Sequence, residues 1–132
     1  MDSMLSFAER EPRPSSKGGR PLRFGWHGDS GLGDHLLEAI LTGRKTATAC
    51  PSYDPKDGDE GEVLALVDKA GEVRGRIRIT RIEHRSLGSF DAALAERLGA
   101  PLAELHRMLT FANSREIGPG EEMRVTYFEL LR

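Results

Sequence analysis

The spacing of apolar side chains changes along the chain and predicts both strands and helices. Apolar residues alternate with polar ones or glycine over residues 22–26, which predicts a short strand. Between residues 32 and 41 they recur every three or four positions, which predicts an amphipathic helix that ends at Gly43. The β-branched and apolar runs that follow predict two more strands, over residues 46–50 and 63–67.

The next strand carries arginine at every second position. Because alternate side chains point to opposite faces of a strand, one face should be apolar and the other basic. The phase of this pattern breaks after Thr80, which predicts a β-bulge at residues 80–81. The apolar face consists of Val73, Ile77 and Ile79, and the basic face of Arg74, Arg76 and Arg78.

The last third of the chain predicts two helices and a final strand. Ser89 can cap a helix over residues 90–98 that stops at Gly99. A second helix should start at Pro101, since proline suits the first helical turn. Residues 123–131 are apolar on both faces, so the strand predicted there should be central in its sheet.

The order of these elements predicts one α+β domain. Strands dominate and hairpins connect them in the middle, which favours a small, mostly antiparallel β-barrel with helices covering its ends. We expect this domain over residues 21–132 of the 132-residue chain. Residues 1–20 are rich in Pro, Ser and Gly and read as a flexible tail; the alternative is a short docking helix around Met4, Leu5 and Phe7.

Composition narrows the possible functions. The chain has 19 basic and 21 acidic residues, so its total charge does not indicate a strongly basic nucleic-acid binder, and only a local basic face stays open. It has no apolar run long enough for a membrane helix and no secretory signal, which favours a cytoplasmic protein. Cys50 is the single cysteine and the four histidines lack ligand spacing, so we expect no internal disulfide, no metal and no cofactor.

The segment after the first helix, Gly43-Arg44-Lys45-Thr46-Ala47-Thr48, resembles the signature of the ASCH family. That signature has a glycine, a lysine two residues later and polar residues across the next strand, here Thr48 and Cys50. The resemblance continues at residues 61–63, 90–91 and 127–128 and covers about residues 22–131. It implies a β-barrel similar to the pseudouridine-synthase/archaeosine-transglycosylase (PUA) domain.

The resemblance also implies a function related to RNA. One branch of the family removes the acetyl group from N4-acetylcytidine with a lysine, a threonine three residues later and a glutamate; another relative is described as a ribonuclease. Lys45 and Thr48 match the first two positions. The glutamate position falls on Leu98, and Glu96 lies two residues earlier.

Three functions therefore stay open. The first is binding of RNA or a modified nucleoside in a pocket around the motif, with contacts from Gly43, Arg44, Thr46, Tyr53 and the arginines 74, 76 and 78. The second is a small hydrolase, an amidohydrolase or a ribonuclease, with Lys45, Thr48 and Glu96 as catalytic residues. The third is an adaptor that binds an unknown protein partner.

Each of these candidate residues also has an interpretation that involves no binding or catalysis. Lys45 is either a solvated lysine that follows a helix, or a base whose pKa is lowered by burial and by a neighbouring cation. Thr48 shares a strand face with Thr46 and Cys50. It is either a nucleophile or an ordinary strand residue without a catalytic role. The arginine strand could follow phosphates or form a wet sheet face paired with acids such as Glu62 and Asp68. A third catalytic group could be Glu83, Glu96, Asp91 or Tyr53.

Overall fold

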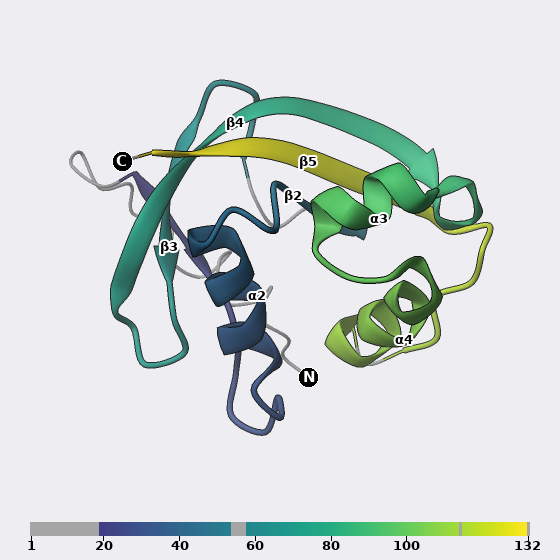
Figure 1. Ribbon diagram of the computed structural model, residues 1–132, viewed down its shortest axis with the longest axis horizontal. Helices are drawn as coiled ribbons and strands as arrows, with labels where there is room; N and C mark the ends of the chain where they lie inside the picture. The colour runs from purple at the N-terminus through teal and green to yellow at the C-terminus, as the bar shows by residue number, and fades with distance from the viewer. Residues whose placement is uncertain (1–18, 54–57, 114, 132) are drawn as a thin grey trace.

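The computed structural model describes residues 19–53, 58–113 and 115–131 (Figure 1). In these ranges the elements are β1 (Arg20–Arg23), α2 (Leu32–Leu41), β2 (Ala47–Pro51), β3 (Val63–Val67), β4 (Val73–Ser86), the 3₁₀ turn η1 (Leu87–Ser89), α3 (Ala92–Leu98), α4 (Leu102–Asn113) and β5 (Glu122–Leu131). The tail predicted over residues 1–20 lies outside the described residues apart from its last two positions, of which Arg20 already belongs to β1.

The strands form one five-stranded sheet in the order β1-β3-β4-β5-β2. β1 runs parallel to β3, and the other three pairings are antiparallel. The long strands β4 and β5 arch over the helices, so the sheet is curved into a half-barrel (Figure 1). The predicted α+β class with a mostly antiparallel sheet is confirmed.

The sheet has an apolar core on each side. Val125 and Tyr127 of β5 pack into a cluster with α3 and α4, whereas Phe128 packs into a second cluster with α2. This split follows from the period of two in a strand, which sends neighbouring side chains to opposite faces. The prediction of a central final strand is confirmed, because β5 lies between β4 and β2.

The predicted bulge in β4 is also confirmed. Ile79 pairs with Phe128 and Arg81 pairs with Tyr127, so Thr80 is the extra residue without a partner position on β5. The bulge returns β4 to register, and the strand continues to Ser86.

Two boundaries predicted from the sequence are wrong. The first strand ends at Arg23 instead of reaching residue 26, because the chain turns away at Gly25, whose φ is 97°. Helix α3 starts after Asp91, whose carboxylate accepts the backbone N–H of Leu94 at 2.9 Å. Ser89 is therefore not the cap; its hydroxyl donates to the carbonyl of Ser86 inside η1.

A buried carboxylate fixes the chain between β1 and α2. Asp29 is 0% exposed and accepts backbone N–H groups from Trp26, Gly31 and Gly33, together with the ammonium of Lys69 at 3.2 Å. Burial by itself raises the pKa of Asp29, but these hydrogen bonds outweigh it and hold the pKa below its usual value. Asp29 thus sets where α2 begins.

Candidate functional site

The motif segment is anchored at both ends by backbone hydrogen bonds. Gly43 ends α2 in a left-handed conformation, with φ at 84°. The backbone N–H of Lys45 then donates to the carbonyl of Ala39 at 2.9 Å, and that of Thr46 donates to the carbonyl of Arg97 at 2.7 Å. The segment is therefore fixed between the end of α2 and the end of α3, which are far apart in the sequence.

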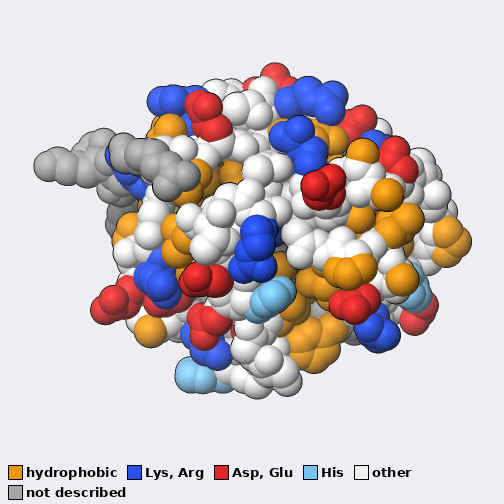
Figure 2. All heavy atoms as spheres, viewed as in Figure 1, with side chains coloured by type: hydrophobic (Ala, Val, Ile, Leu, Met, Phe, Trp, Pro, Cys, Tyr) orange, Lys and Arg blue, Asp and Glu red, His pale blue; other side chains and the backbone are white. Residues whose placement is uncertain are grey.

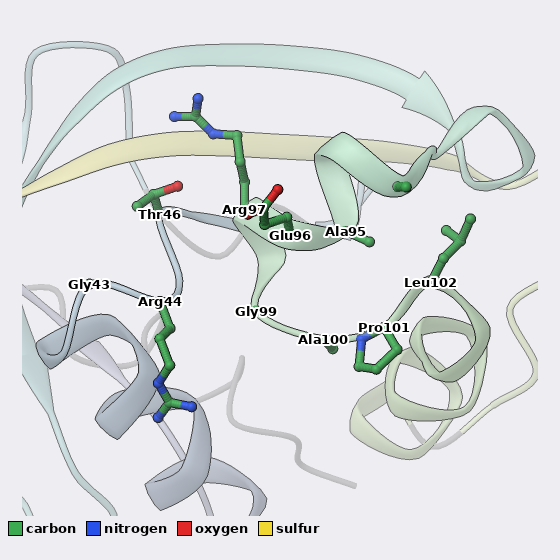
Figure 3. A pocket seen from close by; sticks show the side chains of 11 residues that line it. Gly43, Arg44, Thr46, Ala95, Glu96, Arg97, Gly99, Ala100, Pro101 and Leu102 are labelled. Carbon is green, nitrogen blue, oxygen red and sulfur yellow. The ribbon is translucent and has the colours of Figure 1, made fainter.

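Alternate residues of this segment point to two different cavities. Arg44 and Thr46 line an open pocket of about 720 Å³ on the surface (Figure 3). Lys45, between them, lines a small internal cavity of about 60 Å³. We call these the open pocket and the inner cavity.

The open pocket combines charged and apolar groups. Figure 3 shows Arg97 on one side of Thr46 and Arg44 on the other, with Glu96 next to Arg97. The rest of its wall comes from the start of the motif, α3 and the beginning of α4, namely Gly43, Ala92, Ala95, Gly99, Ala100, Pro101 and Leu102. A pocket of this size with a few polar groups on an apolar wall can hold a small organic ligand.

Lys45 is buried although it follows a helix end. Its side chain is 5% exposed, and Nζ donates to the carbonyl oxygen of Leu98 at 3.0 Å. That carbonyl belongs to the last turn of α3, where helical carbonyls lack a partner within the helix. Burial lowers the pKa of Lys45 to about 7. The interpretation of Lys45 as a solvated lysine is wrong, and the pKa falls through burial rather than through a neighbouring cation.

The inner cavity brings Lys45 and Thr48 together. The rest of its wall is almost wholly apolar and consists of Leu32, Leu36, Ala49, Leu98, Leu105, Met108, Leu109 and Ala112. Its volume is enough for only a few water molecules. Thr46, which the sequence places on one strand face with Thr48, precedes β2 and lines the open pocket instead.

Gly99 forms part of the wall between the two cavities. It ends α3 with φ at 84°, as the sequence predicts, and it lines the open pocket. A Cβ at this position would lie 3.1 Å from Cβ of Lys45. Two features therefore favour glycine at this position: the left-handed backbone conformation, and the lysine stem that packs where a side chain would lie.

The acidic candidates for a third catalytic group lie elsewhere. Glu96 lines the open pocket, Asp91 caps α3, and Glu83 accepts a hydrogen bond from the hydroxyl of Tyr127 at 2.7 Å. This hydrogen bond is the main reason why the pKa of Glu83 lies below its usual value. In the part of the chain that the structure describes, the inner cavity has no carboxylate in its wall.

The remaining predicted binding residues lie outside both cavities. Tyr53 is exposed, and its hydroxyl accepts a hydrogen bond from Nε of Arg115 at 2.7 Å. Arg74, Arg76 and Arg78 are exposed on β4. Two of these arginines have acidic neighbours: Arg74 lies 3.5 Å from Asp68 and Arg78 lies 3.6 Å from Glu129. Glu62, the other acid expected to pair with them, instead binds Arg20.

Sequence reasoning missed two groups at these cavities and a third on the neighbouring strand. Arg97 and the carbonyl of Leu98 come from the end of α3, which no sequence pattern connects to the motif. The third is Thr126 of β5, which lies directly opposite Thr48 in the sheet. Thr126 is 1% exposed, and its Oγ1 has no hydrogen-bond partner among the residues described. Such a buried hydroxyl is uncommon in native proteins.

The described residues show no arrangement typical of a metal centre. Across residues 19–53, 58–113 and 115–131, no three His, Cys, Asp or Glu side chains gather where they could hold one ion. No helix within those ranges has the length and apolar character needed to cross a membrane. Cys50 is buried and lies outside the walls of both cavities.

Two solved structures have the same fold. One is a protein of Enterococcus faecalis described by the family model DUF984, with a TM-score of 0.67, 20% identity, and coverage of 83% of this chain and 74% of that one. The other is an ASCH domain from Lactobacillus crispatus, with a TM-score of 0.66, 16% identity, and coverage of 81% and 76%. No family model and no curated protein matches the sequence. The predicted ASCH-type fold is thus confirmed.

Proposed function

We propose that the protein binds RNA or a modified nucleoside in the open pocket. The observation that supports this most is the volume of about 720 Å³ between the motif segment and the end of α3. Pockets for small organic ligands span ~300–1,000 Å³, and the inner cavity is far below that range. The motif that resembles the ASCH signature therefore borders a space of nucleoside size.

The groups around the pocket suit a nucleotide. Arg44 and Arg97 can donate hydrogen bonds to phosphate or to base carbonyl oxygens, as arginine does in nucleic-acid recognition. Glu96 can accept a hydrogen bond from an exocyclic amino group or a ribose hydroxyl. The apolar wall of Ala100 and Pro101 offers a surface against which a planar base can pack.

Calorimetric titration with cytidine 5′-monophosphate and N4-acetylcytidine tests the proposal. We expect Arg97→Gln to weaken binding about tenfold, which is the loss of one charge-assisted hydrogen bond. Arg107→Gln, which removes an arginine of α4 outside the pocket wall, is the matched control and should bind as the unchanged protein does. Equal affinity for all three proteins, or no binding at all, would contradict the proposal.

A second function, hydrolysis of an acylated nucleobase, is favoured by one specific observation. With a pKa of about 7, a large fraction of Lys45 is a neutral amine near pH 7, and it shares the inner cavity with Thr48. The neutral Nζ can take the proton of the Thr48 hydroxyl, or of a water, as that oxygen attacks the acyl carbon. The protonated Nζ then returns the proton to the nitrogen of the base as the bond between that nitrogen and the acyl carbon breaks. Where Thr48 is the nucleophile, a water then hydrolyses the acyl ester on its hydroxyl and releases the acid.

In this second function, the carbonyl of Leu98 takes the place of the glutamate that the family branch uses. A carboxylate beside Lys45 would stabilise the ammonium form and raise its pKa, whereas an uncharged carbonyl orients Nζ and leaves the pKa low. The inner cavity admits an acyl group but not a nucleoside. The base would therefore occupy the open pocket, and its acyl group would reach past Gly99.

Chromatographic turnover of N4-acetylcytidine tests the second function. The unchanged protein and Arg107→Gln should release acetate, while Lys45→Ala should lose turnover at unchanged fold. If the unchanged protein shows no turnover at high enzyme concentration, the proposal that it hydrolyses this substrate is wrong. The binding proposal is then decided by the calorimetric titration alone.

A further inference from the structure

The bulge in β4 keeps its arginines on one face of the sheet. Residues directly opposite each other in an antiparallel pair have their side chains on the same face. Arg78 lies opposite Glu129, and after the extra residue Thr80, Arg81 lies opposite Tyr127. Glu129 and Tyr127 are two positions apart on β5 and share a face. Without the bulge, Thr80 would occupy the position that Arg81 has.

Four arginines therefore lie along this face, with Glu83 between the last two, and we call these arginines the arginine row. They are Arg76, Arg78, Arg81 and Arg85, which lie opposite Leu131, Glu129, Tyr127 and Met123. The side chains of Arg78 and Arg81 are 46% and 58% exposed. Arg76 is exposed too, whereas Arg85 is partly buried and donates a hydrogen bond from Nε to the hydroxyl of Ser89 at 3.0 Å. The row is thus open to a partner from Arg76 to Arg81.

Tyr127 connects the row to the open pocket. The guanidinium carbon of Arg81 lies over the Tyr127 ring at 4.3 Å from its centre, and that of Arg97 lies over it at 4.8 Å. The ring itself is buried and is fixed by the hydrogen bond from its hydroxyl to Glu83. Because Arg97 also lines the open pocket, basic groups continue from the pocket to the row without a break.

The charge of this surface is positive although the chain has a net charge of −2. Two carboxylates lie on the same face: Glu129 beside Arg78, and Glu83 beside Arg81 and Arg85 at 3.8 and 3.6 Å. The arginines of the row and Arg97 outnumber them. Figure 2 shows basic and acidic side chains interspersed along the upper edge of the molecule, where Figure 1 has β4 and β5.

We propose that the arginine row binds the sugar–phosphate backbone of single-stranded RNA, one base of which occupies the open pocket. This inference rests on the proposed binding function and specifies its partner as a strand rather than a free nucleoside. Arg76 and Arg78 are alternate residues of β4 and so lie ~6.6–6.8 Å apart along the strand, close to the separation of successive phosphates in an extended single strand. Guanidinium planes can also stack on bases, which favours nucleic acid over an acidic protein.

Fluorescence titration with labelled oligouridylates of one, four and eight nucleotides tests the inference. We expect the octamer to bind at least tenfold more tightly than the mononucleotide. Arg76→Gln and Arg81→Gln should each remove much of that gain and leave mononucleotide binding unchanged. Each should also lower the slope of log affinity against log salt by about 0.7, the value for one phosphate contact on a single strand. Arg107→Gln is the charge-matched control.

The outcomes separate the two proposals. If mononucleotide and octamer bind equally and the row variants change nothing, the row is not a backbone site, while nucleotide binding in the pocket survives. If oligonucleotides of every length fail to bind, both proposals are wrong. If duplex RNA or polyglutamate of equal charge binds as tightly as the octamer, the face recognises anions in general, and the inference of a single-stranded partner is wrong.

Discussion

The open pocket and the inner cavity are built from adjacent residues and differ in almost every physical property. Arg44 and Thr46 face a space of about 720 Å³ that is open to the surface. Lys45 faces an apolar cavity of about 60 Å³, where burial lowers its pKa to about 7. The segment between α2 and β2 therefore presents an open surface on one side and a buried amine of lowered pKa on the other.

The difference shows that burial, and not residue type, assigns the roles within this motif. Both Arg44 and Lys45 are cations in the sequence, but only the lysine is enclosed. The wall between the cavities is the turn formed by Leu98 and Gly99. The carbonyl of Leu98 accepts a hydrogen bond from the amine of Lys45, and the absence of a side chain at Gly99 leaves room for the lysine stem. Changes on either side of this wall should separate the two functions.

The largest effect should come from removing the buried charge. Lys45→Met should stabilise the protein by about 2–4 kcal/mol at pH 7, because a fall in pKa from 10.5 to about 7 corresponds to a burial penalty of that order. Urea denaturation of both proteins measures this difference. Ligand binding in the open pocket should not change, since Lys45 does not line it.

The same pair of proteins makes a prediction for pH. The pKa of Lys45 is lower in the folded state, so between pH 7 and 10.5 the unfolded chain binds more protons, and stability rises with pH. As the pH falls through this window the stability is lost, and below about pH 7 the slope disappears. The advantage of Lys45→Met should therefore shrink from pH 7 to 10. A difference that does not depend on pH would show that Lys45 titrates normally.

The next largest effect should come from Asp29, which fixes the start of α2 beside the inner cavity. Asp29→Ala leaves three backbone N–H groups without their acceptor and should cost about 2–3 kcal/mol. Hydrogen exchange of the amides of Gly31 and Gly33 should accelerate. Asp34→Ala, an exposed change in the first turn of α2, is the control and should cost well under 1 kcal/mol. Equal losses would contradict this role of Asp29.

A pair of glycines tests the wall itself. Gly99 and Gly43 both have φ at 84°, so alanine at either position should cost about 1–2 kcal/mol from the backbone alone. Only at Gly99 would the new Cβ meet Lys45, at 3.1 Å, whereas nothing lies within 4 Å of it at Gly43. Gly99→Ala should therefore be the more destabilising by a further fraction of 1 kcal/mol. Denaturation curves for the two variants measure the difference, and equal values would contradict close packing at the wall.

The smallest effect should come from Tyr127, on the side of the open pocket. Tyr127→Phe keeps the ring under both arginines but loses the hydrogen bond to Glu83, which should cost about 1 kcal/mol. The pKa of Glu83 should move up towards its usual value, since that hydrogen bond is the main cause of its lowering. A titration followed by NMR measures it. An unchanged pKa of Glu83 would mean that the neighbouring arginines alone are responsible.

The sequence by itself determined the elements whose patterns are local. The apolar period gave α2 its observed limits, because an amphipathic stripe and a glycine stop are written into consecutive residues. The alternation in β4 predicted the bulge for the same reason. The helix cap at Ser89 failed because Asp91, two residues later, offers the stronger acceptor at the position from which the helix actually starts.

Only the tertiary structure decided the surroundings of the motif. No local pattern shows that the carbonyl of Leu98 meets the amine of Lys45, 53 residues away, or that Arg81 and Arg97 lie over the same ring of Tyr127. These contacts depend on how α3 packs against the strands, and so do the burial of Lys45 and its pKa. Residue types fix which groups a chain can offer, whereas packing fixes their solvent, their partners and therefore their chemistry.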